Sequence, residues 1–130
     1  MSHHEHLADL YLRQSLDREG KTAIERQEAD CRRWGEQNNL EVRAVHVDRV
    51  LSAFKPIDRK GFEAAISALR TRTVGTLIVW KVDRLSRHGM GQVGPVLDDV
   101  EKVAGRIVFV QDGLDTSQEH ARLVLALLSE

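Results

Sequence analysis

Short apolar runs alternate four times along the chain with longer segments whose apolar residues are spaced three and four apart. The runs cover residues 7–14, 42–47, 76–82 and 106–111. One such segment begins at about Asp58. Its apolar residues with helical spacing are Phe62, Ala65, Ile66 and Leu69. Repeated strand–helix alternation predicts an α/β fold. We expect three layers, with a mainly parallel sheet of four to five strands between helices.

The same pattern sets the expected boundaries. Residues 1–6 are polar and are expected to be disordered, and residues 7–130 form one domain, a size that 130 residues allow. A long polar loop is expected at 48–58, and a last helix from Thr116. That helix contains the apolar run at 123–128, which suits either the core or a partner surface. Because the pattern is still helical at Glu130, we expect the chain to be a piece of a longer protein.

Composition narrows the class of protein. Hydrophobic residues make up 42% of the chain and charged residues 30%, which is typical of a folded globular domain. No apolar run approaches the roughly 20 residues of a membrane helix, and the start lacks a signal-peptide pattern. A lone cysteine, Cys31, fits a reducing cytoplasm. The formal net charge of -1 means that any binding of nucleic acid rests on a local patch or on other segments.

Polar side chains follow each expected strand. In open α/β sheets, ligands bind beyond the carboxyl ends of the strands. A serine needs activation to act as a nucleophile, and arginines suit phosphate because they give planar, paired hydrogen bonds. The pattern therefore indicates phosphoryl transfer. The residues at the four strand ends are Arg13 and Ser15; Asp48 and Ser52; Lys81, Asp83, Arg84 and Arg87; and Gln111 and Asp112.

Four motifs in this order resemble the catalytic domain of serine recombinases, the resolvase/invertase superfamily. They are Y-x-R-x-S at 11–15, Asp48 with S-A-F at 52–54, D-R-L-S-R at 83–87, and D-G at 112–113. The resemblance covers residues from about 7 to the end. The first motif is weak alone, whereas its combination with D-R-L-S-R is specific. The extended loop is similar to that of the large serine integrases.

The resemblance implies a DNA recombinase whose serine attacks a phosphodiester and forms a 5′-phosphoserine intermediate, followed by strand exchange and religation. It implies no metal, ATP or other cofactor. The implied partners are double-stranded DNA and further copies of the chain, as a homodimer and a synaptic homotetramer, in a bacterial, phage or mobile-element setting. Because part of the family's catalytic set lies beyond Glu130, we expect this piece alone to be inactive.

The resemblance also assigns roles to residues. Ser15 is the nucleophile, and Asp83 orients an arginine. Positive charge at the phosphate comes from Arg13, Arg84 and Arg87. The supporting residues are Tyr11, Gln27, Asp48, Ser52 and Arg59.

Other interpretations of these residues stay open. An α/β module that binds a phosphorylated ligand without catalysis would use the same arginines. An acyl-transfer hydrolase is disfavoured because Ser15 has no nearby His in sequence and no G-x-S-x-G motif is present. Ser52 and Ser86 are rival nucleophiles. His3, His4 and His6 are a candidate metal site, but a frayed terminus explains them better.

Overall fold

The computed structural model of the chain describes residues 4–14, 21–49, 60–81, 90–118, 121, 123 and 124. Its centre is a five-stranded sheet in the order β2-β1-β3-β4-β5. β1, β2, β3 and β4 pair in parallel, and β5 pairs antiparallel with β4. The strands are β1 (Leu7–Gln14), β2 (Glu41–Arg49), β3 (Thr76–Val79), β4 (Arg106–Phe109) and β5 (Leu114–Asp115).

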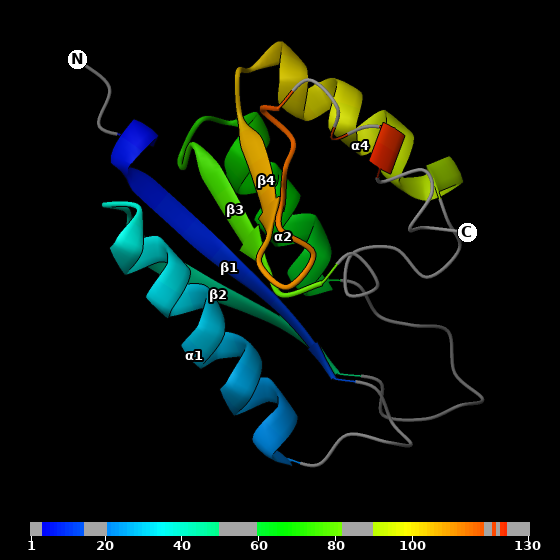
Figure 1. Cartoon of the computed structure of the whole chain (residues 1–130). Coiled ribbons are helices and arrows are strands. Elements are labelled where there is room, and N and C mark those ends of the chain that lie inside the picture. Colours follow the sequence, from blue (N-terminus) through cyan, green and yellow to red (C-terminus); the bar gives the residue numbers. More distant parts are fainter. Residues whose placement is uncertain are drawn as a thin grey trace.

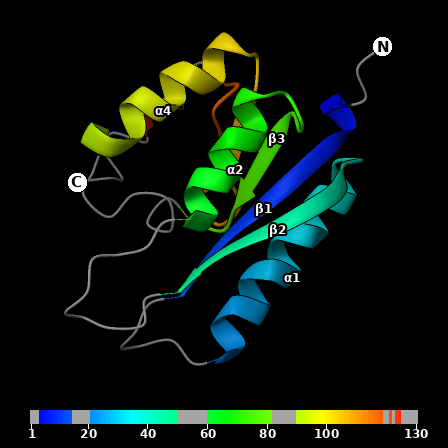
Figure 2. The same cartoon turned by 180° about the vertical axis from the view of Figure 1, so that it is seen from behind.

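Helices cover both faces of this sheet. Helix α1 (Lys21–Gln37) lies on one face, and α2 (Lys60–Arg70) and α4 (Met90–Lys102) lie on the other (Figures 1 and 2). The predicted three-layer α/β fold with a mainly parallel sheet is therefore confirmed. Among the described residues, no helix is long and apolar enough to cross a membrane.

Strand β1 divides the core into two halves. Its side chains alternate between the faces of the sheet, as a pleated strand requires. Ala8, Leu10 and Leu12 pack with α1, whereas Tyr11 packs with α2. All four are fully buried, so the polar residues at the end of β1 are held by a rigid scaffold.

The strand boundaries differ from the sequence pattern at the carboxyl ends of the strands. β3 and β4 end at Val79 and Phe109, although their apolar runs continue. β2 is longer than expected because polar residues through Arg49 still pair with β1. A fifth strand was allowed for, but the position of β5 was not predicted. Just after β5, the Thr116 hydroxyl accepts a 2.8 Å hydrogen bond from the Ile107 amide of β4. Thr116, which was expected to begin the last helix, is therefore bonded to the sheet. Beyond it, Ala121, Leu123 and Val124 are helical.

Disorder was expected at 1–6, of which residues 1–3 lie outside the described residues. His4–His6 form a short 3-10 helix. The Gly75 amide donates a 2.8 Å hydrogen bond to the His4 carbonyl, and a Cβ at Gly75 would lie 3.1 Å from that oxygen. A glycine before β3 therefore lets the two segments approach each other.

Cys31 is a core residue of α1 and is fully buried. Burial, reinforced by the negative charges of Asp30 and Glu28, raises the pKa of the Cys31 thiol from 9.0 to about 12. Because only the thiolate reacts, and this rise in pKa leaves about 10³-fold less thiolate at pH 8, we expect a disulfide reagent to modify the folded protein about 10³-fold more slowly than the unfolded protein. The thiol of the unfolded protein ionises at a lower pH than the thiol of the folded protein. The stability that the protonated Cys31 thiol contributes is therefore fully present below pH 9 and is lost as the pH rises toward 12. Equal labelling rates would contradict this burial.

Candidate functional site

Asp48, near the end of β2, connects three elements. Its Oδ2 accepts hydrogen bonds from the Tyr11 hydroxyl of β1 (2.8 Å) and from the Phe62 amide of α2 (3.0 Å). Its Oδ1 accepts a bond from the Gly61 amide at 2.8 Å. Only 5% of Asp48 is exposed, so this carboxylate is held by fixed donors in place of water.

The bonds to Gly61 and Phe62 have a clear physical origin. The first amides of a helix have no partner within the helix, and the helix N-terminus carries partial positive charge. Asp48 supplies both an acceptor and a negative charge from a distant strand. The Phe62 ring also meets Tyr11 edge-on, with 5.9 Å between ring centroids. The start of α2 is thereby fixed against the ends of β1 and β2.

Gly61 is required for this contact. A Cβ at position 61 would lie 2.8 Å from Asp48 Oδ1 and 3.0 Å from the Val47 carbonyl. We expect Gly61→Ala to lower the free energy of unfolding by about 1–3 kcal/mol, the usual cost of overpacking, as measured by chemical denaturation. Gly35→Ala is the matched control, because a Cβ there meets Ile78 at an ordinary 3.4 Å. A Gly61→Ala protein as stable as the Gly35→Ala protein would contradict the close approach.

Arg13 is held at the end of β1 by Gln27 of α1. The Arg13 amide donates to Gln27 Oε1 at 3.3 Å, and Gln27 Nε2 donates to the Arg13 carbonyl at 3.0 Å. Gln27 is fully buried, and Arg13 is only 4% exposed. Arg13 pairs with Asp48 across β1 and β2, and strand alternation places it on the same face as Tyr11. A guanidinium keeps its charge at any physiological pH, so the strand register makes a permanently charged residue the neighbour of Asp48.

The structure thus brings together four residues that the sequence singled out. Tyr11, Arg13, Gln27 and Asp48 meet where the carboxyl ends of β1 and β2 lie side by side (Figures 1 and 2). The other six candidates lie outside the described residues: Ser15, Ser52, Arg59, Asp83, Arg84 and Arg87. Ser15 is two positions after Arg13 in the sequence.

A second cluster of polar contacts at the ends of β3 and β4 was partly missed by sequence reasoning. Asp30 Oδ2 of α1 accepts bonds from Trp80 Nε1 at 2.9 Å and from Gln111 Nε2 at 3.2 Å. The Lys81 ammonium lies 5.2 Å from the Trp80 ring centroid. Lys81 and Gln111 were recognisable as strand-end residues. Asp30 was not, because one carboxylate on a helix gives no signal of the strands that it contacts.

Comparison with known proteins identifies the family. The family model described as "Resolvase, N terminal domain" matches residues 8–130. The chain belongs to the resolvase family. The serine recombinase resemblance of its motifs is therefore confirmed, and this resolvase-family domain is a recombinase catalytic domain. No curated protein matches its sequence.

Solved structures with the same fold agree with this family. A resolvase family site-specific recombinase from Streptococcus pneumoniae has a TM-score of 0.76 at 23% identity, over 95% of this chain and 83% of that one. The N-terminal catalytic domain of TP901-1 integrase has a TM-score of 0.69 at 24% identity, over 95% and 91%. The C-terminal catalytic domain of ISC1926 TnpA, an IS607-like serine recombinase, has a TM-score of 0.64 at 22% identity, over 80% and 70%. At these identities the likeness shows the shared fold.

The described part of the candidate site contains both a buried arginine and a buried carboxylate. It combines a buried guanidinium with a carboxylate whose oxygens are already bound by a hydroxyl and two amides. Within the described ranges, no group of three His, Cys, Asp or Glu residues is arranged to hold a metal ion. Both carboxylate oxygens of Asp48 already have internal donors.

Proposed function

We propose that the chain is the catalytic domain of a site-specific DNA recombinase in which Ser15 is the nucleophile. The observation that carries the proposal is the gathering of Tyr11, Arg13, Gln27 and Asp48 at the end of β1, two residues before Ser15. All four are residues that the family resemblance assigns to the site. The buried residues of β1 fix the position of Arg13, which is two residues before Ser15 in the sequence.

The proposed step breaks one phosphorus–oxygen bond and forms another. Ser15 Oγ loses its proton and attacks phosphorus, the bond to the 3′-oxygen breaks, and that oxygen gains a proton to become a 3′-hydroxyl. The strand stays attached to Ser15 through its 5′-phosphate. Because the number of phosphoester bonds is unchanged, religation needs no ATP. Reversal by the 3′-hydroxyl of another strand completes the exchange.

Positive charge is the main contribution asked of the protein. Charge on the phosphate oxygens is stabilised best by fixed donors that need no reorganisation. We assign this role to Arg13, whose backbone is fixed by Gln27, together with Arg84 and Arg87. Asp83 is proposed to orient an arginine.

The remaining residues have supporting roles. Tyr11 and Asp48 keep β1, β2 and α2 in register around Arg13, and Ser52 and Arg59 are assigned by resemblance. The proposed partners are double-stranded DNA and further copies of the chain, as a dimer and a synaptic tetramer. A cytoplasmic recombinase of the large integrase type, from a bacterium, phage or mobile element, fits these features. With a net charge of -1, this domain should bind duplex DNA weakly and in a salt-sensitive way.

The proposal is tested by trapping the covalent intermediate. The intact protein is incubated with duplexes that tile the DNA on both sides of its gene, quenched with detergent, and separated on denaturing gels. We expect a protein–DNA adduct that keeps label placed at the 3′ end of the cut strand and releases a piece with a free 3′-hydroxyl. Failure to form an adduct with any tile, or attachment through a 3′-phosphate, would overturn the proposal.

A further inference from the structure

Strand β2 contains a one-residue register shift against β1. Ala8 pairs with Val42, whereas Asp9 pairs with Ala44, so that Arg43 is an extra residue. Side chains alternate along a strand, and one extra residue reverses the face that every later residue presents. Val42 and Val45 accordingly pack in the same core against α1, although they are three positions apart.

This shift decides where Asp48 points. After the shift, His46 lies opposite Tyr11 and Asp48 lies opposite Arg13, on the face that α2 covers. If the pairing before the shift continued unchanged, Val47 would lie opposite Arg13 and Asp48 would turn toward α1. The bonds from Asp48 to Tyr11 and to the start of α2 therefore depend on the extra residue.

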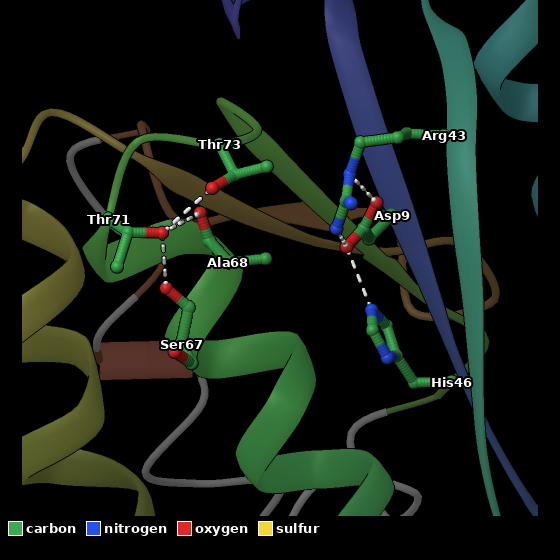
Figure 3. Close-up of polar contacts among 7 residues, drawn as sticks. All are labelled: Asp9, Arg43, His46, Ser67, Ala68, Thr71 and Thr73. Atoms are coloured by element: carbon green, nitrogen blue, oxygen red, sulfur yellow. Dashed lines mark hydrogen bonds and ion pairs between the residues drawn. The ribbon is translucent and has the colours of Figure 1, made fainter.

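A polar cluster built around one buried carboxylate lies at the shift. Asp9 is fully buried, and its carboxylate accepts bonds from Arg43 Nε at 3.1 Å and Arg43 Nη2 at 2.6 Å. His46 Nε2 lies 2.8 Å from Asp9 Oδ2. Figure 3 shows Asp9 between the two side chains of β2. Arg43 is the extra residue itself. His46 is the first residue after the shift with a large side chain on this face of the sheet.

We propose that Asp9 is a positioning residue that fixes the register of β2 and thereby holds Asp48 in the site. A buried carboxylate is costly unless charged or polar donors satisfy it. Moving β2 by one residue would turn its partners away and leave Asp9 without them. Such bulges are rare in parallel pairs, and β2 lies at the edge of the sheet, where β1 is its one neighbouring strand. Selecting a register is the best-attested role of buried polar and ionic groups such as the Asp9 carboxylate.

The consequence for DNA cleavage rests on the proposed function, but the placement of Asp48 does not. Amide hydrogen exchange of Gly61 and Phe62, followed by NMR, reports directly on their bonds to Asp48. In Asp9→Leu we expect these two amides to exchange about tenfold faster or more, while the amides of β3 keep their protection. Asp115→Leu is the matched control, because it removes a carboxylate paired with Arg106 at 3.0 Å, away from β2. Asp115→Leu should leave the exchange rates of the Gly61 and Phe62 amides unchanged.

Deletion of Arg43 separates register control from general stability. Without the extra residue, continuous pairing already places Asp48 opposite Arg13. Adding this deletion to Asp9→Leu should restore the protection of Gly61 and Phe62 to within about threefold of the wild-type value. If Asp9→Leu alone unfolds, recovery of the fold by the same deletion supports the proposal.

Two results would overturn the register proposal. One is that the Gly61 and Phe62 amides of Asp9→Leu exchange at the wild-type rate. The other is that deletion of Arg43 fails to restore the protection of these amides in Asp9→Leu. Its failure is distinguishable from failure of the proposed function. If the exchange pattern holds but the wild-type protein forms no DNA adduct, the recombinase proposal falls while the role of Asp9 stands. If the adduct forms but exchange does not respond, the reverse is true.

Discussion

Ser15→Ala abolishes formation of the covalent protein–DNA adduct, reducing its rate by about 10³-fold or more, the scale seen when a catalytic nucleophile is removed. The reason is chemical, because alanine has no oxygen to attack phosphorus. The substitution removes one small atom, so the free energy of unfolding should stay within about 0.5 kcal/mol of wild type. The measurement is a time course of adduct formation on the duplex that wild type cleaves, with thermal unfolding in parallel.

Ser86→Ala is the matched control for this experiment. Ser86 belongs to the D-R-L-S-R motif and is a rival nucleophile by residue type, but the proposal gives it no chemical role. We expect Ser86→Ala to form the adduct at nearly the wild-type rate. An adduct that persists in Ser15→Ala and disappears in Ser86→Ala would move the nucleophile to position 86.

Arg13→Lys is expected to slow adduct formation by about 10²–10³-fold, the usual cost of losing one fixed donor to a developing anion. Lysine keeps the charge but loses the planar set of donors that matches a phosphate. The backbone bonds between Arg13 and Gln27 do not involve the replaced atoms, so the end of β1 should keep its position. Single-turnover rates on a saturating concentration of the cleaved duplex measure the effect on chemistry.

Arg70→Lys provides the comparison for Arg13→Lys. Arg70 is half exposed on α2 and pairs with Asp99 at 2.7 Å, an exposed ion pair of the kind that contributes little. Its substitution should change the rate by less than about twofold. If Arg13→Lys is equally mild, the guanidinium of Arg13 is not what holds the phosphate.

The fold was predictable because its signals are local. The apolar run at 7–14 became β1 with the same bounds, and Ile66 and Leu69 mark the buried stripe of α2. The elements that the sequence pattern did not predict depend on contacts between distant segments. Strand β5 has two residues and exists through pairing with β4. The 3-10 helix at His4–His6 is fixed by Gly75, about seventy positions away, and no local pattern announces that approach.

The candidate site shows the same division. Tyr11, Arg13 and Asp48 were found because they lie at strand ends in recognisable motifs. Gly61 could not be assigned a role, since its importance comes from the 2.8 Å between a Cβ there and Asp48. Asp9 was not singled out by the sequence. Its partners lie 34 and 37 residues away. In the sequence, the register shift that brings them together shows only as the spacing of three between Val42 and Val45, which breaks the alternation of a strand.

The central claim is that the oxygen of Ser15 becomes bonded to the DNA phosphate, and peptide mass spectrometry of the trapped adduct tests it most directly. Trypsin cleaves after Arg13 and Arg18, and the resulting peptide, Q-S-L-D-R, contains Ser15 as its one hydroxyl residue. After nuclease digestion, we predict that this peptide carries a 5′-linked nucleotide. The same nucleotide on a peptide containing Ser52 or Ser86, with Q-S-L-D-R unmodified, would contradict the account.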